Sequence, residues 1–198
     1  MRCTTSLVAL ALCHLATLTR AEDARSYLRA LGEDSLRCTA CTLVAAKMDD
    51  AIDSKLLKSW AGLTTEERIK KMRSAFSKRA CPQIDDIQVA IMGETGKRKY
   101  VDFQEAMKQG GSLSDVNMGP EQKVQVRTLC ELVAKGGMTE LVGRLEAVLQ
   151  PKGKKKKKAP RLADIRMQAE VCEGMLGTCQ DDKDDDEEAD ADEDDREL

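Results

Sequence analysis

The cysteines are the residues of this 198-residue chain whose spacing most strongly suggests chemistry. Cys38 and Cys41 form a Cys-x-x-Cys pair, the spacing of the exchangeable dithiol in thioredoxin-like sites. Such sites place the pair between a strand and a helix, and no strand pattern precedes Cys38. We therefore favour structural disulfides for both cysteines, with thiol–disulfide exchange as the alternative.

The chain has one histidine, His14, and it lies in an expected leader. Residues 1–21 combine a basic start, an apolar run from Leu7 to Leu18 and a small residue, Ala21, as in a secretory signal peptide. The run is too short to span a membrane. Cleavage after Ala21 leaves no histidine for a Ser-His-Asp triad, a Cys-His pair or a His-ligated metal, so we expect no enzyme.

Removal of the leader reduces eight cysteines to six. An even number in an oxidising compartment predicts three disulfides, for which fifteen pairings exist. The remaining cysteines are Cys38, Cys41, Cys81, Cys130, Cys172 and Cys179.

Helical periodicity narrows these pairings. Cys38 and Cys41 share one face of a predicted helix, and Cys172 lies on a second predicted helix near the other end. If these helices pack antiparallel, the nested pairs Cys38–Cys179 and Cys41–Cys172 follow, and Cys81–Cys130 remains. Cys38 and Cys41 are only about one turn apart, roughly 4.5 Å. Cys179 therefore cannot continue the helix of Cys172, and we assign the break to Gly174 and Gly177.

The rest of the pattern predicts an all-α, disulfide-linked helical bundle over residues 22–180. Aromatic residues make up only 3% of the chain, which argues against a β-sandwich. The methionines Met48, Met72, Met167 and Met175 are assigned to the core, with adaptable surface contacts as the alternative. The first predicted helix covers residues 35–58 with Ser35 as N-cap, and the second begins at a Thr64–Glu67 capping box. A third begins at Pro120, is interrupted at Gly136-Gly137 and resumes at Thr139. The last covers residues 162–176.

Two segments do not fit this helical pattern. Residues 22–34 are polar and predict a single helical turn around Tyr27, Leu28 and Leu31. Residues 83–119 contain a β-prone run and several glycines. We interpret them as an irregular excursion with a short helix or hairpin, joined at its ends by Cys81 and Cys130.

Charge is strongly segregated along the sequence. Residues 181–198 hold thirteen carboxylates and two basic side chains, whereas residues 22–180 hold 28 basic and 22 acidic ones. The lysine-rich loop 151–160 is interpreted as a flexible insertion, with attraction to the acidic tail or to an acidic partner as the alternative. We expect no nucleic-acid partner, because a leader excludes the nucleus and no aromatic platform accompanies the lysines.

The acidic tail has too little hydrophobicity to fold, so we predict disorder. It lacks the turn glycine and spaced ligands of an EF-hand. Weak calcium binding and a role as an accessible spacer both stay open. The candidate calcium ligands are Asp184, Asp185, Asp186, Glu187 and Glu188.

Several motifs together resemble the canopy family of saposin-like, six-cysteine endoplasmic-reticulum proteins. They are Leu36-Arg37-Cys38-Thr39-Ala40-Cys41 with Val44-Ala45-Ala46-Lys47-Met48, Arg127-Thr128-Leu129-Cys130, the pair Cys172 and Cys179, and the final Glu197-Leu198. The resemblance implies nested outer disulfides and a longer excursion between the third and fourth cysteines than in true saposins. It also implies a lumenal helper of secretory-protein maturation that acts with an Hsp90-type chaperone, with links to calcium homeostasis.

The last four residues resemble a KDEL-type retention signal. Asp195-Arg196-Glu197-Leu198 keeps the final Glu-Leu but exchanges the usual order of charges before it, so retrieval would be weaker. We therefore expect a non-enzymatic co-chaperone or folding factor of the endoplasmic-reticulum lumen, without cofactor or transmembrane segment. The alternatives are a thiol–disulfide oxidoreductase at Cys38 and Cys41, a low-affinity calcium buffer, and lipid binding as in true saposins, the least favoured.

Overall fold

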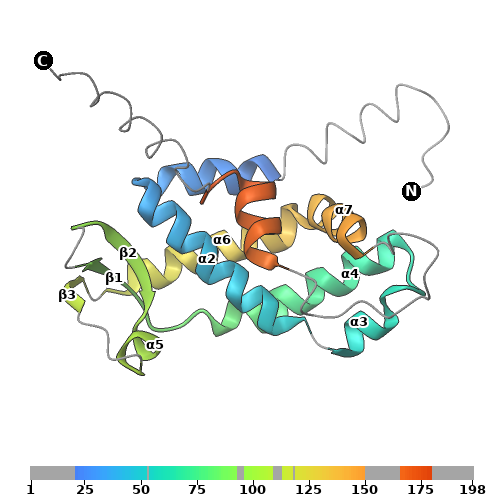
Figure 1. Cartoon of the computed structure of the whole chain (residues 1–198), viewed down its shortest axis with the longest axis horizontal. Coiled ribbons are helices and arrows are strands. Elements are labelled where there is room, and N and C mark those ends of the chain that lie inside the picture. The colour runs from blue at the N-terminus through green and yellow to red at the C-terminus, as the bar shows by residue number, and fades with distance from the viewer. Residues whose placement is uncertain are drawn as a thin grey trace, which may run out of the picture.

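The computed structural model describes residues 21–52, 54–92, 96–108, 113–117, 119–149 and 166–179. These residues are mostly helical, with a small sheet at one end of the molecule (Figure 1). Residues 21–30 are helical. The elements that follow are α2 (Asp34–Ala51), α3 (Ser54–Trp60), α4 (Thr65–Ala75), the π-helix η1 (Phe76–Ala80), the 3₁₀ turn η2 (Cys81–Gln83), β1 (Ile87–Met92), β2 (Arg98–Asp102), α5 (Phe103–Lys108), β3 (Leu113–Asn117), α6 (Pro120–Gly136), α7 (Met138–Leu149) and the π-helix η4 (Ala169–Leu176).

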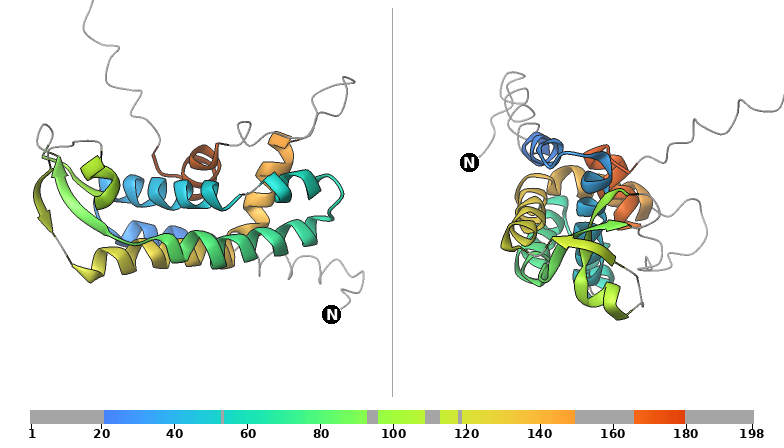
Figure 2. Two further views of the ribbon diagram at one scale, coloured as in Figure 1. Left: turned by 90° about the horizontal axis from the view of Figure 1, so that it is seen from below. Right: turned by 90° about the vertical axis from the view of Figure 1, so that its left-hand side faces the viewer.

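Helix α2 lies at the centre of the fold. It packs against α6 and η1 on one side and against η4 on another, while the sheet and the α3–α7 end occupy opposite ends of the long axis (Figure 2). Its buried face includes Ala40, Cys41, Val44 and Met48, all at 1% exposure or less. The four methionines assigned to the core from the sequence are all buried, which confirms that assignment.

The predicted helix 35–58 is wrong as a single element. It is divided where Ile52 adopts an extended conformation, and the Ile52 N–H donates to the Asp49 carbonyl at 3.0 Å. No basic residue occupies the last turn of α2, whereas Asp49 and Asp50 place negative charge at the negative end of the helix dipole. Ser35 is not the N-cap either. Glu33 holds that position without a side-chain hydrogen bond.

The start of α4 confirms the predicted capping box. The Glu67 N–H donates to Thr64 Oγ1 at 3.3 Å, and the Thr64 N–H donates to Glu67 Oε2 at 2.9 Å. Hydrogen bonds from Thr64 lower the pKa of Glu67, because they favour the charged carboxylate. Arg68 then joins three elements: its guanidinium lies 5.3 Å from the centre of the Trp60 ring and 2.7 Å from Glu146 Oε1.

The fold is mostly helical but not all-α. Residues 83–119 contain both the hairpin and the short helix that the sequence offered as alternatives, and a third strand that it did not predict. They form an antiparallel three-stranded sheet in the order β2-β1-β3, with the short helix α5 after β2. The β1–β2 register pairs Ile87 with Asp102 and Ile91 with Arg98, and a register shift interrupts the β1–β3 ladder. The β-branched run that supplies β1 favours a pleated, half-buried surface. Helix α2 provides the apolar face on which this small sheet packs.

Tyr100 fixes the sheet on the helices. Its ring is buried, its backbone N–H donates to Thr39 Oγ1 at 3.0 Å, and its hydroxyl donates to Gln125 Oε1 at 2.6 Å. Burial raises the pKa of the Tyr100 phenol. These bonds bring β2 to the beginning of α2, next to Cys38, and so determine which side chains surround the outer disulfide.

Three further expectations concern helix boundaries. Residues 21–30 form a longer helix than the predicted single turn, and Ala24 and Leu28 bury its inner face. The interruption at Gly136-Gly137 is confirmed, with α7 starting at Met138. Of the predicted helix 162–176, the part from residue 167 is helical, and residues 162–165 lie outside the described residues.

Candidate functional site

The candidate site lies where the first turns of α2 meet the end of η4. Cys38 is bonded to Cys179 and Cys41 to Cys172, across sequence separations of 141 and 131 residues. The third disulfide, Cys81–Cys130, spans 49 residues and closes the base of the excursion that contains the sheet. These are the three pairs that the helical spacing and the family resemblance predict.

The two nested disulfides differ in their surroundings. Cys41 and Cys172 are fully buried in the core, whereas Cys38 and Cys179 are partly exposed. Neither member of the Cys-x-x-Cys pair is bonded to the other. Exchange at Cys38 would therefore have to open a bond that joins two distant parts of the chain.

The turn between Cys172 and Cys179 assigns different roles to the two glycines proposed as a break. Gly177 has a φ of +66° and caps η4 in the left-handed conformation, and the next N–H donates to the Cys172 carbonyl at 2.8 Å. Gly177 therefore provides the break. Gly174 does not, because it remains inside η4; a Cβ there would lie 2.5 Å from Arg144 Nη1.

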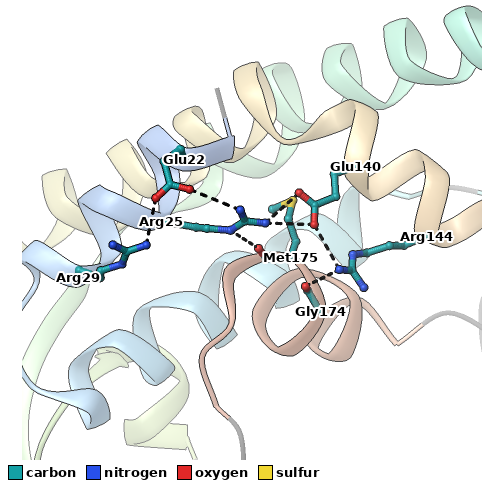
Figure 3. Close-up of polar contacts among 7 residues, drawn as sticks. All are labelled: Glu22, Arg25, Arg29, Glu140, Arg144, Gly174 and Met175. Atoms are coloured by element: carbon teal, nitrogen blue, oxygen red, sulfur yellow. Dashed lines mark hydrogen bonds and ion pairs between the residues drawn. The ribbon is translucent and has the colours of Figure 1, made fainter. Parts of the chain in front are cut away.

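A polar cluster holds the end of η4 against two other helices (Figure 3). Arg25 Nε donates to the Met175 carbonyl at 2.7 Å, and Arg144 Nη2 donates to the Gly174 carbonyl at 2.5 Å. Glu140 lies between the two guanidiniums, 3.1 Å from Arg25 Nη2 and 3.2 Å from Arg144 Nη2. Cations thus bind the unpaired carbonyls of the last helical turn, where the helix dipole favours positive charge.

A basic cleft opens beside this cluster and beside the outer disulfide. It has a volume of about 700 Å³ and is bordered by the helix at residues 21–30, the start of α2, β2 and the segment that follows η4. Its charged lining residues are Arg25, Arg29, Arg37, Lys97, Lys99 and Asp34. Five cations therefore share this space with one carboxylate.

Some of these cations are compensated locally. Arg37 Nη2 lies 2.7 Å from Asp34 Oδ1, and Arg29 Nη2 lies 3.1 Å from Glu22 Oε1. Arg25 is paired with Glu140. Within the described ranges, the Lys99 ammonium has no carboxylate within 4 Å, and the buried Arg37 Nε has no hydrogen-bond partner. With Glu22 and Glu140 counted, five cations still face three carboxylates, so the cleft keeps an excess of positive charge and suits an anionic ligand.

The sequence did not reveal this cleft. Arg25 and Arg29 are four residues apart on one helix face, and Lys97 and Lys99 lie just before and within the start of β2, so each pair carried a local signal. Nothing in the sequence placed β2 beside residues 21–30. The only wider signal was the excess of basic side chains in residues 22–180.

The other residues singled out from the sequence lie outside the described residues. They are the leader up to residue 20, the lysine-rich loop 151–160, the candidate calcium ligands Asp184–Glu188 and the retention signal Asp195–Leu198. In the part that is described, no three His, Cys, Asp or Glu side chains gather as a metal site would require. Nor is any helix there long and apolar enough to cross a membrane.

Comparison of this chain with known protein families, curated proteins and solved structures finds no match.

Proposed function

We propose that this chain is a saposin-like folding factor of the endoplasmic-reticulum lumen, of the canopy type, that assists the maturation of secretory or membrane proteins. In this proposal it acts beside an Hsp90-type lumenal chaperone and catalyses no reaction itself. The expected leader at residues 1–21 and the KDEL-like end at Asp195–Leu198 support a lumenal location.

The observation that carries the proposal is the nested pair of disulfides between α2 and the end of η4. Bonds of this kind persist in oxidising compartments and are rare in the cytosol. They close a helical body in the order of pairs that the canopy resemblance implies. A body closed in this way offers a fixed surface to partners.

The oxidoreductase alternative has weaker support. A reactive thiolate needs access and an electropositive setting, and Cys41 is fully buried in a disulfide to Cys172. Cys38 borders a basic cleft, but its disulfide partner is Cys179 and not Cys41. We therefore assign the Cys-x-x-Cys spacing to scaffold formation.

Lipid binding, as in true saposins, would need a continuous exposed apolar face. Among the described residues the large apolar side chains that are exposed are Met107, Val124 and Val148, on three different helices. Because they are separate, they form no continuous apolar face and give lipid binding no support. Weak calcium binding by Asp184–Glu188 stays a prediction, and calorimetry on the full chain with these five side chains neutralised would test it.

The experiment uses the purified mature chain with all disulfides formed. Sedimentation velocity should show a complex with a purified lumenal Hsp90-type chaperone, and the chain should slow aggregation of an unfolded antibody heavy chain. Free thiols should remain absent throughout. Absence of both effects would contradict the proposal, and insulin reduction that a Cys41→Ser variant abolishes would favour the oxidoreductase instead.

A further inference from the structure

The acidic tail leaves the folded body at the edge of the basic cleft. Gly177, Thr178 and Cys179 line the cleft, and the Cys38–Cys179 disulfide fixes the last of them in place. The first tail carboxylate, Asp181, is two residues further along the chain. The point of attachment and the cationic lining are therefore immediate neighbours.

The two partners have opposite charge. Five cations line the cleft and face three carboxylates, Asp34, Glu22 and Glu140, which leaves an excess of positive charge. Residues 181–198 carry thirteen carboxylates against two basic side chains. Arg37 and Lys99 are partly buried, and ion pairs formed there are screened less by salt than pairs at a fully exposed surface. An acidic peptide would supply the carboxylate that the Lys99 ammonium lacks among the described residues.

We propose that residues 181–195 of this chain dock in its own basic cleft and cover the Cys38–Cys179 disulfide. This inference does not depend on the proposed function. An extended chain advances about 3.3 Å per residue, so Asp184–Asp186 reach roughly 15–25 Å from Cys179. Tethering through a short segment also sets an effective concentration in the millimolar range, which makes a weak electrostatic contact sufficient.

The lysine tract 152–158 is the competing binding site for the acidic tail. The cleft differs from it in having cations on folded elements: Arg25 is paired with Glu140 of α7, Arg37 with Asp34 of the same helix, and Lys99 lies within β2. Binding to cations already held in place requires less ordering on the protein side. We therefore assign the tail to the cleft.

Zero-length cross-linking of the full mature chain tests this contact directly. A carbodiimide joins a lysine amine to a carboxylate as an amide, with loss of water, only where the two groups touch. In the isolated monomer we expect amides between the tail and Lys97 or Lys99. They should disappear in 0.5 M NaCl, where the Debye length falls to about 4 Å. Tail amides confined to residues 152–158 would overturn the proposal.

Peptide binding provides a second readout that does not need the lysine amines. The probe is a labelled peptide of residues 181–195, and the protein is the full chain with Asp184, Asp185 and Asp186 changed to Asn and Glu187 and Glu188 changed to Gln. Fluorescence anisotropy should show at least fivefold tighter binding to this chain than to the native chain, whose own tail competes. Equal affinities would contradict tail docking.

Matched lysine pairs then locate the binding surface. On the neutralised-tail chain, Lys97→Gln with Lys99→Gln should weaken peptide binding at least tenfold. Lys70→Gln with Lys78→Gln removes the same charge from exposed positions on α4 and η1, outside the cleft, and should change affinity less than threefold. Equal losses for the two pairs would mean non-specific attraction and would overturn the assignment to the cleft.

Discussion

Removal of the outer disulfide tests how closely the two nested bonds cooperate. The perturbation is Cys38→Ala with Cys179→Ala, compared with Cys41→Ala with Cys172→Ala and with all four changes together. Alanine is preferred to serine because Cys41 and Cys172 are fully buried, and a buried hydroxyl without a partner destabilises the folded state.

The chain-entropy relation sets the expected magnitudes. A single cross-link over 131 or 141 residues is worth about 5 kcal/mol. Once one nested bond exists, the other closes only the three steps from Cys38 to Cys41 and the seven from Cys172 to Cys179. A loop of about ten residues corresponds to about 2.7 kcal/mol. Each single removal should therefore cost about 2.7 kcal/mol, and removal of both about 8 kcal/mol.

Urea unfolding of the full mature chain under non-reducing conditions measures these values. The signal is the fluorescence of the only tryptophan, Trp60, which is 4% exposed in the folded protein. We expect the double removal to exceed the sum of the two single removals by about 2 kcal/mol or more. Single removals that each cost about 5 kcal/mol and add without excess would refute the nested geometry.

Three other changes test local features, each by urea unfolding. Thr64→Ala removes the cap of α4 and should cost about 1 kcal/mol, and no loss would contradict the capping box. Gly137→Ala would place a Cβ 2.7 Å from the Met175 sulfur and should destabilise the chain by about 1–3 kcal/mol. Its control is Gly143→Ala, whose Cβ would have no atom within 4 Å and which should stabilise the chain by about 0.5–1 kcal/mol. Equal effects of the two changes would contradict the packing around Gly137. Burial raises the pKa of Asp49 above its unfolded value, so ionisation of Asp49 destabilises the folded state. Asp49→Asn should therefore stabilise the chain by about 0.3–1 kcal/mol at pH 7, and the gain should vanish as the pH falls below the raised pKa towards the unfolded value; a gain independent of pH would contradict this.

The features that the sequence predicted well depend on residues close together in the chain. The capping box of α4 needs only Thr64 and Glu67, which lie within one helical turn. The left-handed cap of η4 needs only a glycine at residue 177. The disulfide pairing is long-range, but it could be predicted because Cys38 and Cys41 lie on one helix face and so restrict where their partners can be. Helical periodicity, together with the rule that each cysteine forms one disulfide, was therefore enough to predict the pairing.

The features that the sequence did not predict depend on how separate elements pack. The run that forms β1 has strand propensity, yet a sheet also needs β3, whose sequence has no clear alternation. The contact of Arg25 with Glu140 joins positions 115 residues apart, and no spacing rule connects them. The basic cleft needs β2 and residues 21–30 together. The sequence indicated most of these elements singly, but it did not indicate how they pack against one another.

The packing of η4 shows why the glycines there were partly misassigned. Both Gly174 and Gly177 suit a break on propensity grounds alone. Only Gly177 adopts a positive φ, whereas Gly174 leaves space for the guanidinium of Arg144. Close approach of another side chain and a left-handed backbone both require glycine. The sequence alone therefore cannot distinguish the two requirements.

Disulfide mapping of the native protein under non-reducing conditions tests the central claim most directly. Trypsin leaves Cys38 and Cys41 together in residues 38–47, and Cys172 and Cys179 together in residues 167–183. The account predicts that these two peptides remain joined, that fragmentation assigns the nested order, and that residues 80–97 remain joined to residues 128–135. Recovery of residues 38–47 as a separate peptide closed by a Cys38–Cys41 bond would contradict the account.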